Sequence, residues 1–473
     1  MMRANPESTD YSRFDEKSLA PIEGESGEKQ THAKESPRTK KAQAERDGLT
    51  HERQGGGLNS GVSHESAWPE PGGSCKAQPE MAQHENSENL RNEICELLTR
   101  LVEVDSSNPP GGEAGVLEII KDFAASHGLE SKVFPALPGR SNLVLRLSGQ
   151  QPDQALAFTG HMDVMPVHEA ERRRWRSDPF VARLEGDKLY ARGSCDMKGG
   201  LVCALLAMST AAREQAEGRL KLPHDVYLLC TVDEEGDMRG SKALLKEAFL
   251  RYIESLVVCE PTGLKLCTQG GGRSYGRISL SGQAGHASQH QANVIDAAAD
   301  LITRLEKTSL SEEQDDNGHR NFWQVLGIRT DQTPYVIPDQ LSLDLDARLL
   351  PDFRTADVWE KFAAVAAETE QRYPQFHIST EVLDCREGWT LKNDAFSSRL
   401  SRALAAAEIP EVRETFYGTT DASRFVTAGL SAVIFGPGDL ALAHRENEYL
   451  ELEQACRATR FYFQLMQEGE HRA

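Results

Sequence analysis

The sequence has 473 residues and nine cysteines but no C-x-x-C pair. An odd number of cysteines without paired spacing is typical of reduced thiols, so neither a disulfide framework nor a cysteine zinc site is expected. The N-terminal region lacks the apolar core of a signal peptide. The longest apolar run, Leu201–Ala212, is too short to span a bilayer. These absences predict a cytoplasmic protein with no membrane partner.

Positive charge is also scarce. The 53 Lys and Arg residues stand against 73 Asp and Glu residues, which gives a formal net charge of −20. Nucleic acids and anionic membranes are bound through basic surfaces, so neither is expected as a partner. A Walker phosphate loop is absent, since Lys198-Gly199-Gly200 reverses the order of that motif. A small anionic substrate held by one or two local arginines is still compatible with this negative net charge.

Composition and hydrophobic pattern divide the chain into four segments. Residues 1–86 are polar and poor in large apolar side chains, which predicts a disordered tail. Over residues 87–274, continuously apolar strand-like runs alternate with helix-like runs, a pattern typical of a parallel sheet covered on both faces. Residues 275–383 alternate apolar and polar residues, which predicts a separate α+β domain inserted into the first. The parallel pattern returns over residues 384–473. The expected fold class is therefore α/β, a mostly parallel sheet flanked by helices, with an inserted α+β domain.

Histidine and acidic side chains follow the ends of three apolar runs in the first domain. Ala155–Thr159 precedes His161, Val226–Val232 precedes Glu234 and Glu235, and Leu256–Cys259 precedes Glu260. Open parallel sheets bind ligands outside the carboxyl ends of their strands. Two further candidates are Asp196, which follows a turn of small residues, and His444, which lies in a loop rich in glycine and proline. Together these residues predict one site.

The candidates suit a metal centre. Asp196 has two oxygens, so it could bridge two ions, a recurrent arrangement in hydrolytic sites. Nitrogen and oxygen donors of this kind suit zinc or a similar divalent ion. Glu234 and Glu235 are adjacent and point in different directions, so one could bind metal while the other acts as a general base. The alternative to a metal-binding role for the acidic run Asp233–Glu235 is an ordinary solvated turn.

Three further residues are candidates for supporting roles. Asp163 lies two residues after His161, so it could accept the second ring N–H of that histidine and fix its tautomer. His286 lies among small residues and could equally be a packed loop histidine. Arg348 ends an alternating strand, where it could pair bidentately with a carboxylate or simply be exposed.

Five motifs in this order resemble a known family: the two-metal amidohydrolases and peptidases that include acetylornithine deacetylase, succinyl-diaminopimelate desuccinylase, aminoacylase and glutamate carboxypeptidase. The resemblance runs from Glu88 to Gln467, and the wording of the motifs is most similar to acetylornithine deacetylase. The motifs are Thr159–Pro166, Leu189–Gly200, Thr231–Gly236, Cys259–Thr262 and Gly436–Glu448.

The resemblance implies a role for each candidate in the first domain. One ion would be held by His161 and Glu260, and the other by Glu235 and His444. Asp196 would bridge both ions and be followed by a cis peptide to Met197. Asp163 would orient the first histidine, and Glu234 would be the general base.

The resemblance also implies that the inserted domain is a lid that forms a homodimer. His286 would reach the partner subunit's site and stabilise the oxyanion. Arg348 would hold the substrate carboxylate, together with the loop that contains Gly418 and Thr419. Tyr335 and Ser423 differ from the residues that are common at these positions in the family, which leaves the identity of the substrate open.

The expected function is hydrolysis of the amide bond of an N-acyl amino acid, in the manner of acetylornithine deacetylase, by water that Glu234 deprotonates. The expected cofactors are two divalent ions, with zinc the first choice and cobalt or manganese the alternatives. A dipeptidase, a carboxypeptidase or a succinyl-diaminopimelate desuccinylase would use the same site on a different small substrate. A catalytically silent binding protein is the rival of a different class.

Overall fold

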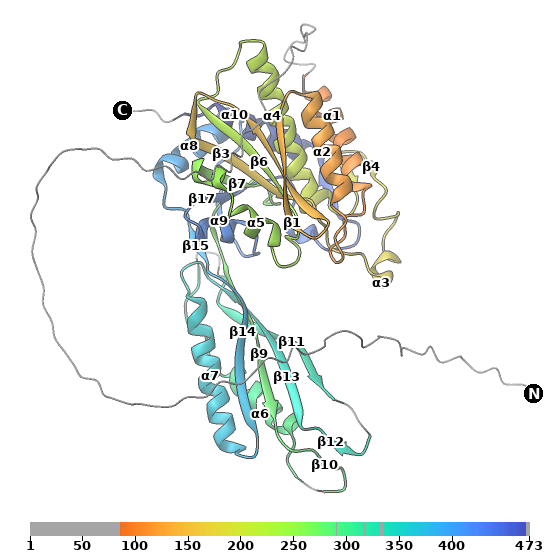
Figure 1. Cartoon of the computed structure of the whole chain (residues 1–473), viewed down its shortest axis with the longest axis vertical. Helices are drawn as coiled ribbons and strands as arrows, with labels where there is room; N and C mark the ends of the chain where they lie inside the picture. Colours follow the sequence, from red (N-terminus) through yellow and green to blue (C-terminus); the bar gives the residue numbers. More distant parts are fainter. Residues whose placement is uncertain (1–85, 290, 316–317, 332–333, 470–473) are drawn as a thin grey trace, which may run out of the picture. The chain divides into compact units, whose positions relative to one another are not determined.

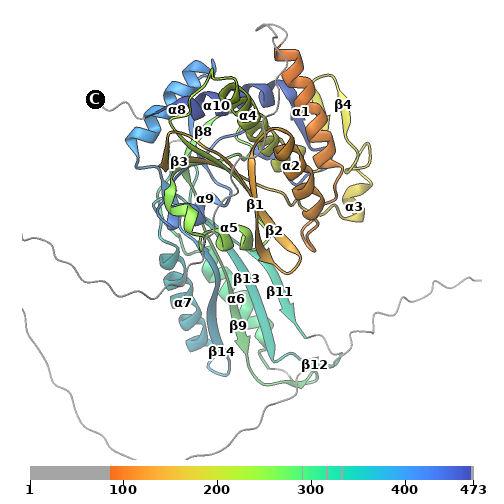
Figure 2. The same cartoon turned by 45° about the horizontal axis from the view of Figure 1, so that its top comes forward.

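The computed structural model describes residues 86–469, except 290, 316–317 and 332–333. The tail predicted over residues 1–86 lies almost wholly outside the described residues, so its disorder stays a prediction. Figures 1 and 2 show the chain from two directions. The described α-helices are α1 (Asn86–Val102), α2 (Ala114–Ser126), α3 (Glu169–Arg172), α4 (Gly199–Ala216), α5 (Arg239–Leu244), α6 (Val294–Glu306), α7 (Thr355–Arg372), α8 (Asp394–Ala406), α9 (Ala422–Thr427) and α10 (Leu452–Gln467).

The larger sheet has the strand order β1-β2-β6-β3-β7-β17-β8-β15, and β16 pairs with β8. Its centre is parallel, because β3 pairs in parallel with β6 and β7, and β17 with β7. Strands β1 and β2 on one side, and β8 and β15 on the other, join by antiparallel pairing. The expected fold class is confirmed, with antiparallel edges added. The strands are β1 (Glu130–Leu137), β2 (Arg140–Leu147), β3 (Gln151–His161), β6 (His224–Thr231), β7 (Ile253–Val258), β8 (Leu266–Gly270), β15 (Trp389–Thr390), β16 (Arg413–Phe416) and β17 (Ser431–Ile434).

Helices cover both faces of this sheet. On one face, α1, α2, α4, α8 and α10 share a buried core with strand residues such as Phe158 and Leu228. On the other face, α5 and α9 pack against the intervening residues, such as Ala157 and Leu229. Both faces of the sheet are therefore buried from solvent, which explains why the central strands are continuously apolar.

From Gly199 to Ala212, helix α4 is buried on nearly every side, since it is enclosed by the sheet, α1 and α10. The segment Ser194–Ala216 is long and apolar enough to cross a membrane, but 89% of its apolar window is buried within the protein. That burial is what a core helix of a folded domain requires.

The second sheet is antiparallel, in the order β11-β13-β9-β14. Its strands are β9 (Gly272–Ser281), β11 (Phe322–Thr330), β13 (Gln340–Leu349) and β14 (His377–Arg386). Alternate residues such as Ile278 and Leu343 form a core with α6 and α7, while the intervening residues point to the opposite face. This is the α+β architecture that the alternation predicts, although β9 begins before residue 275 and β14 ends after residue 383. A short pair, β10 (Gly285–His286) and β12 (Val336–Ile337), lies between β9 and β13 in sequence.

Two helices differ from the sequence pattern. The apolar residues of Ser241–Tyr252 predict one helix, but Glu247 is extended and separates α5 from the 3₁₀ turn η2 (Ala248–Tyr252). The pattern from residue 448 also predicts a helix start, but the first residues form β18 (Tyr449–Glu451). This strand pairs with β5 (Lys188–Tyr190), which in turn pairs with β4 (Arg183–Glu185), so α10 begins only afterwards.

Candidate metal centre

Parallel strand topology brings the predicted ligands to one edge of the large sheet. His161 is the last residue of β3, the acids from Asp233 to Glu235 follow β6, and Glu260 follows β7. These three strands are neighbours and run in the same direction, so their carboxyl ends meet. His444 reaches the same place from the loop after β17.

Asp196 lies between two histidines. Its Oδ1 is 3.2 Å from Nε2 of His161, and its Oδ2 is 3.1 Å from Nε2 of His444. The nearest oxygen of Glu260 is 3.7 Å from the first ring, and that of Glu235 is 3.0 Å from the second. Each oxygen of one carboxylate therefore faces its own histidine and its own glutamate. This arrangement is compatible with the two pairs of ligands that the resemblance implies.

These donors fit divalent cations. Two groups of three have ligand atoms within 4.8 Å of one another, one made of His161, Glu234 and Glu260, the other of His161, Asp196 and Glu235. Burial raises the pKa of Glu260 well above its usual range, and the nearby Asp196 charge raises it further. Buried carboxylates packed so closely need positive charge nearby, which a cation supplies.

Protons on the histidines supply positive charge in the metal-free chain. Burial opposes the charged form of His444, but hydrogen bonds to Asp196 and Glu235 outweigh it and raise its pKa to about 10. The pKa of His161 is also raised well above its usual value, mainly by Asp196 against the effect of burial. A divalent ion would replace these protons, because only the neutral imidazole is a ligand.

A buried glutamate holds the Asp196 segment in place. Oε1 of Glu448 accepts the backbone N–H groups of Cys195 and Asp196, both at 3.0 Å. Its Oε2 accepts a bond of 2.8 Å from Arg192, whose side chain is also almost fully buried. The peptide from Asp196 to Met197 is cis, as the resemblance implies. Sequence reasoning did not single out Glu448, although it closes the His444 motif.

Asp163 acts differently from the expectation. Nδ1 of His161 lies 2.9 Å from the backbone carbonyl of Asp163, whereas the nearer carboxylate oxygen is 3.7 Å away. The carboxylate instead accepts the backbone N–H groups of Glu234 and Glu235 and the side-chain amide of Asn108. The prediction that the carboxylate orients the ring is therefore wrong. Its oxygens are taken by three other donors, and they tie the two glutamates to the histidine loop.

Asp233 is not part of the metal cluster. It accepts bonds from Arg140 at 3.1 Å and from Arg239 at 2.6 Å, so two guanidinium groups neutralise it. Repulsion between neighbouring acids of this run therefore concerns Glu234 and Glu235, and it adds to the effect of burial in raising the pKa of Glu234. Asp233 and His444 both have positive φ, at 66° and 58°, a conformation uncommon for such residues and frequent at functional sites.

Glu234 has the environment of a proton acceptor. It is buried, and its Oε1 has no hydrogen-bond partner among the described residues. Burial raises its pKa well above the usual range, and the neighbouring Asp421 and Glu235 charges add to the rise. Asp421 was missed by sequence reasoning. It is buried as well, and it accepts a hydrogen bond of 2.9 Å from Thr231.

The residues predicted to contact the substrate fall into two groups. Arg348, Gly418 and Thr419 lie together, whereas His286, among the described residues, does not contact the predicted metal ligands. Arg348 donates to Thr419 at 3.3 Å, which brings together two residues predicted to bind substrate. The Cβ of any other residue at Gly418 would lie 2.5 Å from the ring of Phe416, so that loop needs glycine. His286 is exposed at the end of β10. Within the described part of the chain, it makes no hydrogen bond or ion pair with the predicted metal ligands.

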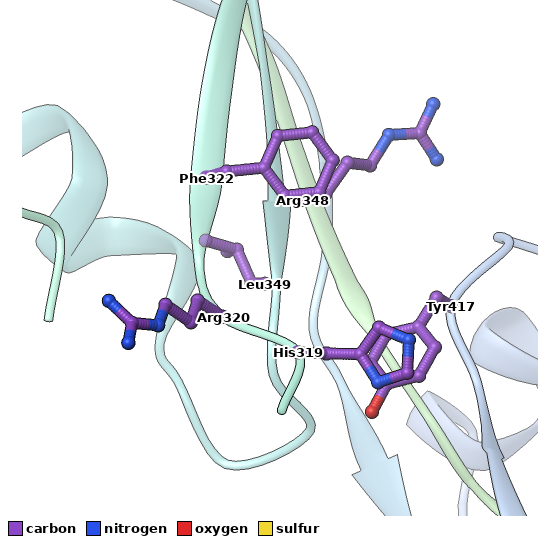
Figure 3. Close-up of a pocket in the computed structure, with 6 residues that line it drawn as sticks. All are labelled: His319, Arg320, Phe322, Arg348, Leu349 and Tyr417. Atoms are coloured by element: carbon purple, nitrogen blue, oxygen red, sulfur yellow. The ribbon is translucent and has the colours of Figure 1, made fainter. Parts of the chain in front are cut away.

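A cavity of about 340 Å³ lies beside Arg348 (Figure 3). The rings of His319 and Tyr417 are in contact at one side of it, with centroids 4.0 Å apart and an angle of 34° between their planes. No pattern in the sequence indicates this cavity, since His319 and Tyr417 are far apart in the chain. The lining residues are His319, Arg320, Phe322, Arg348, Leu349 and Tyr417.

Residues 157–468, more than half of the chain, match Peptidase family M20/M25/M40. The chain belongs to this family. A probable succinyl-diaminopimelate desuccinylase from Staphylococcus aureus is 25% identical over 405 residues, which cover 76% of this chain and 93% of that protein. An acetylornithine deacetylase from Myxococcus xanthus is 31% identical over 310 residues, which cover 64% of this chain and 77% of that protein.

The fold of this M20-family chain is also found in a dinuclear metal-binding peptidase of the M20 family from Bacillus subtilis. The crystal structure of that peptidase has a TM-score of 0.62 and 15% identity, and the match covers 80% of this chain and 97% of the other. The family and the named relatives confirm the resemblance seen in the motifs. The protein is a metal-dependent hydrolase of amide bonds.

Proposed function

We propose that the protein removes the acyl group from a small N-acyl amino acid, as an acetylornithine deacetylase does, with the help of two divalent ions. The observation that carries this proposal is the position of Asp196, whose two oxygens each face a different histidine. The acetylornithine deacetylase among the relatives, at 31% identity, supports the choice of substrate class. Zinc suits the nitrogen and oxygen donors, and cobalt or manganese would be alternatives.

We assign His161 and Glu260 to one ion, Glu235 and His444 to the other, and Asp196 to both. When bound at these residues, divalent ions lower the pKa of water and polarise the substrate carbonyl. Every ligand comes from a different segment of the chain, so the geometry depends on the sheet edge that carries them.

Glu234 is the proposed general base. Its unpartnered Oε1 takes a proton from the attacking water and later delivers it to the leaving nitrogen. A raised pKa suits both steps, because a carboxylate of ordinary pKa is a poor donor at neutral pH. Buried surroundings also strengthen the interaction between this carboxylate and the reacting groups.

The inserted domain supports a homodimer. β11 is the edge strand of its sheet, and it exposes Phe322, Leu326 and Ile328, each more than half accessible. An exposed, apolar edge strand is a natural pairing surface for a second copy. In such a dimer, the exposed His286 would be free to enter the partner subunit's site. A cytoplasmic location and the absence of nucleic-acid and membrane partners stay predictions.

The alternative functions are desuccinylation of succinyl-diaminopimelate and cleavage of a dipeptide or C-terminal amide. The desuccinylase relative covers more of this chain than the deacetylase does, and the family includes peptidases. A panel of N-acetyl, N-succinyl and N-formyl amino acids and simple dipeptides, assayed with and without chelator, separates these functions.

Replacement of the base tests the mechanism. Glu234→Gln keeps the size of the side chain but removes its proton-accepting charge, so turnover should fall by at least about 100-fold. Metal content should stay at the wild-type value, because Glu234 is not one of the five assigned ligands and glutamine keeps a side-chain oxygen beside His161 and Glu260. Near-normal turnover in this variant would contradict the assignment of the base.

A further inference from the structure

The cavity beside Arg348 lies where the inserted domain meets the loop after β16. Arg348 and Phe322 are directly opposed on the adjacent strands β13 and β11, so their side chains point to the same face of the sheet. His319 precedes β11, whereas Tyr417 follows β16 of the large sheet. With a volume of about 340 Å³, the cavity falls within the range of small-molecule sites, about 300 to 1,000 Å³.

The loop Tyr417–Asp421 connects this cavity to the proposed general base. Its first residue lines the cavity, and its third, Thr419, accepts a bond of 3.3 Å from Arg348. Its last residue accepts a bond of 2.9 Å from Thr231, the end of β6, and Glu234 follows three residues later. Four residues of extended chain reach at most about 14 Å. One small substrate can therefore contact the cavity, Arg348 and the base together.

The bonding within an N-acyl amino acid determines where its side chain goes. One carbon atom carries the carboxylate, the nitrogen of the scissile amide and the side chain. With the carboxylate on Arg348 and the amide at Glu234, the side chain leaves in a third direction. The cavity beside Arg348 provides space for it.

The lining of this cavity is largely aromatic and apolar, and its charged groups are positive. The rings of His319 and Tyr417 are in contact, with centroids 4.0 Å apart. A third ring packs well against such a pair in an offset or tilted arrangement. The described residues that line the cavity include two arginines and no acid. In Figure 3 the guanidinium of Arg320 points away from the ring pair, so the rings form that side of the cavity.

Two acids contact the lining residues, and both are already engaged. Asp315 accepts the backbone N–H of His319 at 2.7 Å, and its carboxylate also lies 3.2 Å from Nδ1 of that ring. Asp346 accepts bonds from Arg273 at 2.5 Å and from Arg348 at 2.7 Å. An ammonium group that enters the cavity would lose hydration without gaining an acidic partner of its own, which is costly.

We propose that this cavity receives the side chain of the substrate's amino acid and selects a neutral aromatic side chain over a cationic one. The inference rests on the proposed function, in which Arg348 holds the carboxylate of the amino acid. The reaction is still removal of an acyl group, and the substrate class is the N-acyl derivatives of aromatic amino acids. A phenylalanine derivative places its ring against His319 and Tyr417, whereas an ornithine derivative brings an ammonium group to a positively charged lining.

Comparison of N-acetyl-phenylalanine, N-acetyl-leucine and N-acetyl-ornithine tests this selectivity. For the zinc-loaded wild type, kcat/KM of the phenylalanine derivative should exceed that of the leucine derivative about threefold and that of the ornithine derivative about 10-fold. In Tyr417→Leu and in His319→Ala, the ratio of kcat/KM for the phenylalanine derivative to that for the ornithine derivative should fall about three- to 10-fold, mostly through KM. The His319 side chain is 50% exposed, so its removal should leave the fold intact.

His377→Ala is the matched control. His377 is also a histidine of the inserted domain, and its Nδ1 lies 3.1 Å from Glu370, much as that of His319 lies 3.2 Å from Asp315. It begins β14 and is not one of the residues that line the cavity. This control should keep the wild-type selectivity ratio. Tyr417→Phe, which keeps the ring, should recover most of the selectivity lost in Tyr417→Leu.

Binding of 3-phenylpropionate provides a readout that does not depend on turnover. This probe has a carboxylate and a phenyl ring but no amide. Calorimetric titration of the metal-loaded protein should give a dissociation constant that rises about 10-fold in Tyr417→Leu and less than about twofold in His377→Ala. A second probe, 5-aminopentanoate, has an ammonium group in place of the ring and should bind the wild type more weakly than 3-phenylpropionate does.

Three results would overturn the proposal. They are a wild-type preference for the ornithine or the leucine derivative; an equal loss of kcat/KM with the phenylalanine and ornithine derivatives in Tyr417→Leu; and unchanged binding of 3-phenylpropionate in that variant. If no N-acyl amino acid is hydrolysed, the proposed function fails, while the titration still decides whether the cavity binds an aromatic carboxylate.

Discussion

Replacement of Glu448 by alanine should weaken both the fold and the metal centre. The carboxylate accepts two backbone N–H groups of the Asp196 segment and one bond from Arg192. Side chains of this pair are 0% and 2% exposed. Loss of one partner of a buried ion pair typically costs about 3 to 5 kcal/mol, because the other charge stays buried without compensation. Arg192 keeps its bond to Glu171, so the lower half of that range is expected.

The same variant should bind metal more weakly. Removal of a residue that orients a metal ligand typically lowers affinity by about 10- to 100-fold. Urea unfolding of the metal-free protein measures the first effect, and zinc titration against a competing chelator measures the second. Glu448→Gln keeps an acceptor for the two backbone N–H groups but loses the charge, so it should fall between wild type and alanine in both assays.

Glu446→Ala is the matched control in the same loop. Glu446 pairs with Arg174 in solvent, so its removal should change neither stability nor metal affinity measurably. If Glu448→Ala keeps wild-type stability and metal affinity, the account of how the Asp196 segment is held is wrong.

Three other predictions concern the helix next to the site, the pH dependence and the core. Gly200→Ala in α4 should lower the melting temperature, because the added Cβ would lie 1.9 Å from the carbonyl oxygen of Cys259. Alanine favours helices more than glycine does, so a more stable variant would contradict this close packing. Protonated His444 stabilises the metal-free fold fully below the unfolded pKa of about 6.5. That contribution disappears as the pH rises through the folded pKa of about 10. The rise in melting temperature on adding zinc should therefore grow from pH 6 to pH 9, and a constant rise would refute this. Phe158→Ala should lower the unfolding free energy by about 3 to 5 kcal/mol in urea titrations, since Phe158 is fully buried against Tyr462; a loss below about 1 kcal/mol would contradict that burial.

The hydrophobic pattern of the sequence predicted the features that depend on residues close together in the chain, namely the strands and the ligands that follow them. Continuously apolar runs located the central parallel strands, and the positions of His161 and Glu260 followed from the rule that ligands gather at the carboxyl ends. The alternation of β13, with Leu343 and Leu345 on one face, located the inserted sheet. Each of these signals lies within a few residues of chain.

Features that depend on contacts between distant segments were not predictable in this way. Glu448 acts on Asp196 across 252 residues, and nothing in the sequence next to Glu448 indicates that contact. The pairing of Asp233 with Arg140 removes it from the cluster, which no local acidic pattern could indicate. The cavity beside Arg348 is lined by His319 and Tyr417, which come together only in the folded chain. Long-range pairing, rather than propensity, decides all three cases.

The central claim is that one carboxylate, Asp196, bridges two ions in an enzyme that needs both. Metal analysis of purified wild-type protein and of Asp196→Asn, combined with hydrolysis of N-acyl amino acids before and after chelation, tests it most directly. We predict two ions per chain and chelator-sensitive, zinc-restorable hydrolysis in the wild type, with loss of both metal and activity in the variant. Full hydrolysis by protein that contains one ion or none per chain would contradict the account.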